Sequence, residues 1–143
     1  MSDRYFLDTN VFVYCFDRSD RKKQQRAEQL VGQALADHLG VISSQVVQEF
    51  LNVATRKFKT PMTAREAGAY LDSVLVPLCE VFPSFALYAA ALKIQEDTGF
   101  SFYDALALAG AVEAQCRVFY SEDLQSGRTL GGLKIQNPFA NPG

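Results

Sequence analysis

Histidine and cysteine are scarce in this sequence of 143 residues. It contains one histidine, His38, and three cysteines, Cys15, Cys79 and Cys116. No two of these residues have the spacing of zinc ligands, and each cysteine lies within an apolar run. We therefore expect three buried, reduced thiols and no zinc site. A Ser-His-Asp or Cys-His catalytic group would depend on His38, which is better explained as a residue at the end of a polar helix.

Long hydrophobic runs are also missing. The most apolar stretches, residues 86–92 and 105–112, are too short to span a bilayer, and the charged N-terminus is unlike a signal peptide. We therefore expect a cytoplasmic protein that makes no contact with a membrane. The length and the 48% of hydrophobic residues suit one domain that covers residues 1–143.

The sequence has no excess of positive charge. Its formal net charge is −2, which argues against passive binding along a nucleic-acid backbone but leaves room for an enzyme with a local basic patch. Basic residues gather in two segments, 18–26 and 56–65. The candidates for contact with nucleic-acid phosphates are Arg18, Arg21, Lys22, Arg56 and Lys57. Ordinary solvated helix faces explain these residues equally well.

Short apolar runs alternate with stretches of helical periodicity along the chain. Strands are predicted at residues 4–7, 41–42, 78–82 and 118–120, with a weak fifth at 133–135. The first helix is short and is predicted to be capped by Thr9 or Asn10. The second is predicted over 20–38, and Gly40 is expected to end it. Further helices are predicted over 44–58, from residue 63 onward, over 84–97 and over 101–115. This alternation indicates an α/β fold in which helices flank a small, mostly parallel sheet of about four to five strands.

Four acidic residues occupy the ends of these predicted elements. Asp8 and Asp123 follow strands, and Glu49 and Asp104 lie near helix N-termini, so all four are expected at one edge of the sheet. Each alone has an ordinary explanation as a turn residue, a helix cap or a solvated side chain, and Glu122 is an alternative to Asp123. Together they would repel, by about 4 kcal/mol for a pair at ~4 Å near a protein surface. A bound cation or a raised pKa is then required.

Oxygen ligands without histidine or cysteine favour a hard cation, Mg²⁺ or Mn²⁺. Thr9, Asn10 and Ser121 stand beside the acids and are candidates to orient the carboxylates or bound waters, although plain turn chemistry explains them equally well. Such a site suits hydrolysis of a phosphodiester.

The acids and their neighbours resemble a known family. The segments Leu7-Asp8-Thr9-Asn10, Ser101-Phe102-Tyr103-Asp104-Ala105 and Tyr120-Ser121-Glu122-Asp123-Leu124, with Glu49 between the first two, resemble PIN-domain ribonucleases and especially VapC-type toxins of bacterial toxin–antitoxin systems. No single motif is specific, but the ordered set spans almost the whole chain. The resemblance implies a three-layer PIN-like fold, Mg²⁺- or Mn²⁺-dependent RNA cleavage, a homodimer and a cognate antitoxin protein. It also implies that the catalytic and metal-binding residues are Asp8, Glu49, Asp104 and Asp123.

Other functions stay open at this point. The chain can be a stand-alone PIN-type RNA-processing nuclease, or a non-catalytic α/β module that binds metal or protein. A phosphatase of the haloacid-dehalogenase kind is disfavoured because Asn10 stands where a second aspartate is expected. Nucleotide-binding enzymes are disfavoured because neither G-x-G-x-x-G nor G-x-x-x-x-G-K-[ST] occurs.

Overall fold

A six-stranded sheet forms the centre of the molecule in the computed structural model, which describes residues 3–140. The strands are β1 (Tyr5–Leu7), β2 (Gly40–Ser43), β3 (Cys79–Val81), β4 (Val118–Tyr120), β5 (Thr129–Leu130) and β6 (Leu133–Gln136). Their order across the sheet is β3-β2-β1-β4-β6-β5, and all pairs are parallel except β5 with β6. The predicted mostly parallel sheet is confirmed. The two-residue β5 was not predicted.

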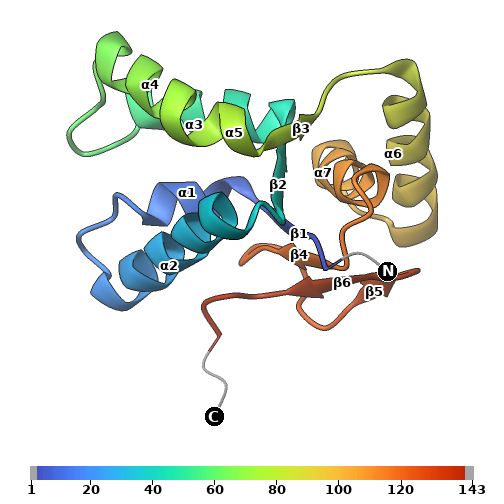
Figure 1. Cartoon of the computed structure of the whole chain (residues 1–143). Coiled ribbons are helices and arrows are strands. Elements are labelled where there is room, and N and C mark those ends of the chain that lie inside the picture. Colours follow the sequence, from blue (N-terminus) through green and yellow to red (C-terminus); the bar gives the residue numbers. More distant parts are fainter. Residues whose placement is uncertain (1–2, 141–143) are drawn as a thin grey trace.

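Helices cover both faces of this sheet. They are α1 (Thr9–Tyr14), α2 (Arg21–Asp37), α3 (Ser44–Arg56), α4 (Ala64–Tyr70), α5 (Val76–Leu78), α6 (Phe85–Thr98) and α7 (Phe102–Glu113), with a π-helical segment η1 (Leu71–Leu75) between α4 and α5. Figure 1 shows α6 and α7 on one side of the strands and α1 to α3 on the other. The three-layer α/β architecture expected from the sequence is therefore confirmed. No helix in the described part of the chain is long and apolar enough to cross a membrane.

Aromatic side chains pack between the two central strands and also between the helices. Phe6 on β1 stacks on Phe119 on β4 with ring centroids 5.0 Å apart, and both rings are fully buried. On the helical side, Phe50 of α3 contacts Phe12 of α1 and Tyr70 of α4. The contact of Phe12 with Phe50 holds α1 against α3, and these two helices carry Asn10 and Glu49.

The connection between α2 and β2 differs from the prediction. Gly40 was expected to end the helix, but His38 is the residue in the left-handed conformation, at φ 59°, and Gly40 is already part of β2. A Cβ atom at position 40 would lie 2.3 Å from Cβ of Ala34. Glycine therefore serves a close approach of strand and helix rather than the helix end.

Candidate functional site

Asp8 lies at the point where β1 ends and α1 begins. Its carboxylate accepts hydrogen bonds from the Thr9 backbone N–H at 2.8 Å and from the Ser121 hydroxyl at 2.8 Å. Asp8 itself is thus the N-cap of α1, and the predicted cap at Thr9 or Asn10 is wrong. Because Asp8 supplies the cap, the side chains of Thr9 and Asn10 in the first turn are free to contact other residues.

The electrostatics of Asp8 set it apart from the other acids. The pKa of its carboxyl group is raised to about 6, mainly by burial and to a smaller extent by the negative charges of Glu49 and Asp123. The hydrogen bonds from Ser121 and Thr9 act in the opposite direction but do not cancel the effect of burial. Glu49 and Asp123 are therefore each close enough to Asp8 to repel its ionised carboxylate.

Glu49 lies on α3 and is held by two neighbours. The Thr9 hydroxyl donates a hydrogen bond to its Oε1 at 2.6 Å, and the Gln45 amide lies 3.4 Å from its Oε2. The same amide nitrogen donates to the Tyr103 backbone oxygen at 3.0 Å. Gln45 thereby joins Glu49 to the start of α7, where Asp104 is exposed. The sequence reasoning missed Gln45, although its position four residues before Glu49 on one helix was a usable signal.

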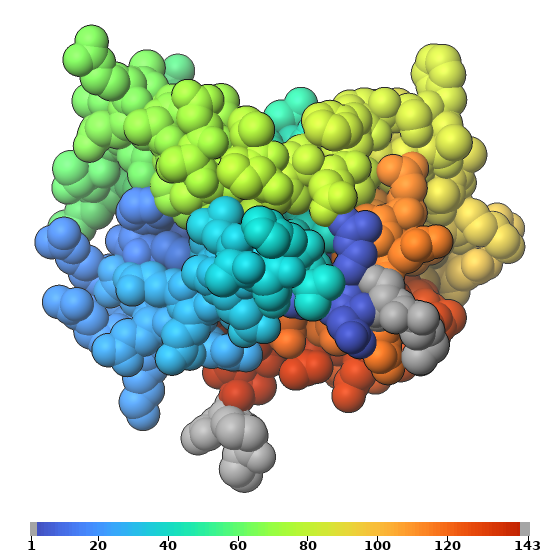
Figure 2. Space-filling view, viewed as in Figure 1, coloured from blue at the N-terminus to red at the C-terminus, as the bar shows by residue number. Residues whose placement is uncertain are grey.

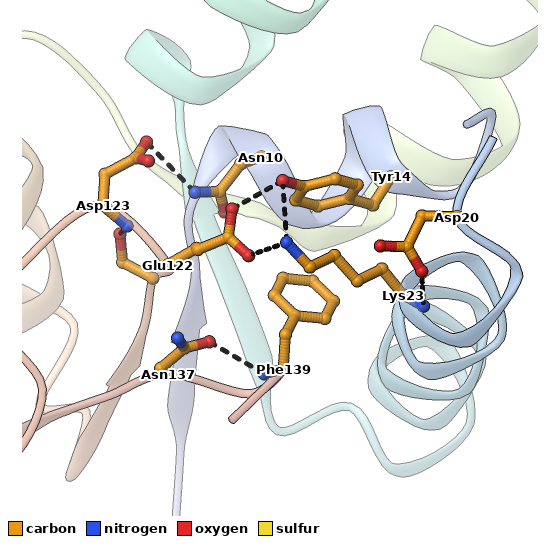
Figure 3. Close-up of polar contacts among 9 residues, drawn as sticks. Asn10, Tyr14, Asp20, Lys23, Glu122, Asp123, Asn137 and Phe139 are labelled. Carbon is orange, nitrogen blue, oxygen red and sulfur yellow. Dashed lines mark hydrogen bonds and ion pairs between the residues drawn. The ribbon is translucent and has the colours of Figure 1, made fainter. Parts of the chain in front are cut away.

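Asp123 and Glu122 follow β4 and take different partners. The Asn10 amide donates to Oδ2 of Asp123 at 3.1 Å, and the Asp123 backbone N–H donates to the Ser121 hydroxyl at 3.2 Å. Glu122 turns away from these residues and pairs with Lys23 and Tyr14 (Figure 3). Of the two adjacent acids, only Asp123 faces the residues around Asp8.

The donor set suits a hard cation. The Oδ1 atom of Asn10 and the Oε1 atom of Gln45 are buried and have no hydrogen-bond partner, so each amide oxygen can accept a bond from a water molecule or contact a cation. Between residues 3 and 140, no three His, Cys, Asp or Glu side chains are grouped closely enough to hold one metal ion as they stand. Mg²⁺ keeps several waters and needs only one or two carboxylates directly, so the residues around Asp8 fit such an ion.

The five basic candidates do not lie together. Arg18 and Lys57 line one groove of about 1200 Å³ between the α1–α2 loop and the α3–α4 loop, with Phe16 and Phe58. Arg21, Lys22 and Arg56 are exposed but do not line this groove. In Figure 2 the segment around residue 60 lies directly above that around residue 17 at one edge of the molecule. Lys23, a neighbour of the candidates, binds Glu122 instead of facing solvent.

Comparison with known proteins gives one family match. The model of the family described as "PIN domain" matches residues 5–129. No curated protein matches the sequence at the level expected of a relative.

Several solved structures share the fold at low sequence identity. A structure described as FitAB bound to a DNA fragment has a TM-score of 0.70 at 15% identity, over 97% of this chain and 98% of that chain. A toxin–antitoxin complex from Klebsiella pneumoniae has a TM-score of 0.66 at 14% identity, over 94% and 97%. VapC20 from Mycobacterium tuberculosis, described as a toxin that cleaves the sarcin-ricin loop, has a TM-score of 0.60 at 18% identity, over 83% and 89%.

Proposed function

The chain belongs to the PIN-domain family, and on this premise we propose that it is an endoribonuclease that hydrolyses RNA phosphodiester bonds with the help of Mg²⁺ or Mn²⁺. The proposed catalytic and metal-binding residues are Asp8, Glu49, Asp104 and Asp123. The observation that carries the proposal is Asp8, a carboxylate held by two hydrogen bonds in a desolvated position beside two other negative charges. A cation at this position would offset that repulsion.

Each polar neighbour has a role in this proposal. Ser121 and the Thr9 N–H fix the two oxygens of Asp8, the Thr9 hydroxyl orients Glu49, and Asn10 holds Asp123. The unpaired amide oxygens of Asn10 and Gln45 can hold water next to the acids. A bound divalent cation would supply the Lewis acidity that activates water and offsets charge on the phosphate.

We further propose that the protein is the toxin of a toxin–antitoxin pair. Its fold is shared with the toxin–antitoxin complex from Klebsiella pneumoniae and with the toxin VapC20 from Mycobacterium tuberculosis. A cognate antitoxin protein is then the expected partner. A stand-alone RNA-processing nuclease would have the same fold and site but no such partner.

The homodimer is proposed on a separate observation. Apolar side chains stand exposed on and just before α6, where Phe85 is 90%, Phe82 60% and Leu92 55% exposed. Isolated exposed apolar residues are ordinary, but a row of them on one helix is typical of a protein interface. We propose that a second copy of this chain covers this apolar surface of α6.

A cleavage assay tests the nuclease. Purified protein is incubated with a mixture of long RNAs, including tRNA and ribosomal RNA, in Mg²⁺, in Mn²⁺ and in chelator. We expect cleavage that requires the cation and falls at least about a hundredfold in Asp8→Asn, since positioned carboxylates of this kind contribute factors of that size.

The matched control is Asp72→Asn, which removes an exposed acid of η1 that is not one of the proposed site residues. It should cleave like the wild type. If Asp8→Asn cleaves at the wild-type rate, the proposed site is wrong. If the wild type and Asp72→Asn cleave no RNA in either cation but both bind Mn²⁺, the non-catalytic alternative is favoured.

A further inference from the structure

The two adjacent acids after β4 point in different directions, as Figure 3 shows. Asp123 extends toward the Asn10 amide, and Glu122 extends toward α2. Two residues that share one peptide bond therefore connect two separate groups of side chains. Contacts that fix the Glu122 side chain also restrain the backbone that carries Asp123, because the two residues share one planar peptide bond.

Glu122 is held strongly for a residue of a short loop. Lys23 lies 2.6 Å from its Oε2, and the Tyr14 hydroxyl donates to its Oε1 at 2.5 Å. Only 33% of the Lys23 side chain and 24% of the Glu122 side chain are exposed. The Lys23 ammonium also lies 4.9 Å from the centroid of the Tyr14 ring and 6.0 Å from that of Phe139. An ion pair shielded in this way is weakened less by solvent than an exposed pair.

The partners of Glu122 belong to rigid parts of the molecule. Tyr14 is the last residue of α1, and Lys23 lies in the first turn of α2, where its backbone N–H donates to the capping carboxylate of Asp20 at 3.1 Å. The ring of Phe139 packs edge-on against Tyr14 with centroids 4.9 Å apart. The loop that carries Asp123 is thus tied to α1 and α2 from outside, while Leu124 is buried on its inner side.

We propose that Tyr14, Lys23 and Glu122 form a positioning clamp that keeps the Asp123 carboxylate beside Asn10 and Asp8. The clamp rests on the proposed function, because it gives Asp123 a role toward a divalent cation. It assigns Lys23 a role inside the protein instead of one on RNA phosphates. It also assigns Glu122 to positioning, so that Asp123 alone of the two acids serves the site.

Mn²⁺ binding to four proteins tests the clamp. They are the wild type, the double variant Lys23→Met/Glu122→Gln, the single variant Asp123→Asn, and the triple variant that combines them. The double variant removes one positive and one negative charge, so the net charge near the site is unchanged. We expect Mn²⁺ affinity to fall about tenfold in the double variant, as is typical for residues that orient metal ligands. In the Asp123→Asn background the same change should cause no further loss.

This non-additivity separates positioning from a general structural role. A clamp that acts through Asp123 has nothing left to position once that carboxylate is gone, whereas a general weakening of the fold lowers Mn²⁺ affinity equally in both backgrounds. Equal losses in the two backgrounds, or unchanged affinity in the double variant, would overturn the proposal.

Two single substitutions complete the controls. Lys22→Met removes the adjacent, exposed lysine of α2 and should leave Mn²⁺ affinity unchanged. Lys23→Arg keeps the positive charge and should retain most of the wild-type affinity. A tenfold loss in Lys22→Met would mean that disturbance of α2, and not loss of the contact with Glu122, lowers the Mn²⁺ affinity, which would overturn the clamp.

Hydrogen exchange in metal-free protein distinguishes failure of the clamp from failure of the proposed function. We expect the amides of residues 121–125 to exchange faster in the double variant than in the wild type, with α6 as an internal reference. Equal exchange in the two proteins overturns the clamp even if Mn²⁺ binds. A wild type that binds no Mn²⁺ overturns the proposed function, and with it the role of the clamp toward a cation.

Discussion

The hydroxyl of Ser121 donates a hydrogen bond of 2.8 Å to Oδ2 of Asp8. The two residues follow β4 and β1, which pair in parallel with Leu7 opposite Tyr120. This register brings the first residue after each strand into contact at the carboxyl edge of the sheet. The fold thus holds the Asp8 carboxylate in a fixed position with little access to water. This raises the free energy of ionising Asp8 in the folded protein.

Asp8→Asn should stabilise the metal-free protein at high pH. The pKa of Asp8 is about 6 in the folded protein and 3.8 as its ordinary value, so the folded state favours the protonated form. The cost of ionising Asp8 is absent below pH 3.8, grows as the pH rises, and is complete above pH 6. Asparagine removes this cost and still caps a helix, so we expect a gain of at most about 3 kcal/mol at pH 8.

Urea unfolding in chelator at pH 4 and at pH 8 measures this effect. The two proteins should differ little in stability at pH 4, and the variant should be the more stable at pH 8. Added Mg²⁺ should narrow the difference at pH 8 by stabilising the wild type alone. A variant that is less stable than the wild type at pH 8 in chelator would show that ionised Asp8 does not destabilise the fold.

Thr9→Val should weaken Mn²⁺ binding because it removes the hydroxyl that donates to Glu49 at 2.6 Å. The Thr9 backbone N–H, which binds Asp8, is unaffected by the substitution. We expect a loss of about tenfold in Mn²⁺ affinity, measured by calorimetry. Thr9→Ser restores the hydroxyl and should restore the affinity. If serine and valine bind Mn²⁺ equally well, the Thr9 hydroxyl does not orient a ligand.

The groove between the α1–α2 and α3–α4 loops gives a third prediction. Arg18 and Lys57 line it, and we expect Arg18→Gln/Lys57→Gln to weaken RNA binding and to reduce its dependence on salt by about two phosphate contacts. Binding is measured by fluorescence anisotropy at several salt concentrations, in the Asp8→Asn background so that the RNA stays intact. Lys93→Gln on α6, in the opposite layer, is the control for loss of a positive charge outside the groove. An unchanged salt dependence in the double variant would show that RNA phosphates do not contact the groove.

Local sequence signals predicted the parts of the site that depend on strand ends. The apolar run before Asp8 and the run before Ser121 each end in polar residues, and in a parallel sheet such ends must meet. The positions of Asp8, Ser121 and Asp123 at one edge therefore followed from the order of elements.

Contacts between distant residues were not predictable in this way. Lys23 and Glu122 are 99 positions apart, and nothing local distinguishes Lys23 from the exposed Lys22 beside it. The packing of α2 near the C-terminal segment brings Lys23 within reach of Glu122 and Phe139 and leaves Lys22 exposed. The π-helical turn at residues 71–75 likewise has no signal in its composition, because it depends on how the chain enters β3.

Gly40→Ala tests the corrected role of this glycine. The added Cβ would lie 2.3 Å from Cβ of Ala34 and 3.2 Å from Cε2 of Tyr5, so β2 and α2 must separate to admit it. We expect the free energy of unfolding in urea to fall by about 1–3 kcal/mol or more, the usual cost of overpacking a core. β2 leads directly into α3, so the shift should also displace Glu49 and weaken Mn²⁺ binding.

Gly32→Ala on the same helix is the matched control, because a Cβ there meets no atom within 4 Å. Alanine is favoured over glycine in a helix by about 1 kcal/mol, so this variant should be more stable than the wild type. Opposite signs at positions 32 and 40 would establish that close approach, and not helix termination, requires glycine at 40. If Gly40→Ala were as stable as the wild type, the contact between β2 and α2 would have to be looser than the 2.3 Å approach implies. Gly40 would then be replaceable by alanine.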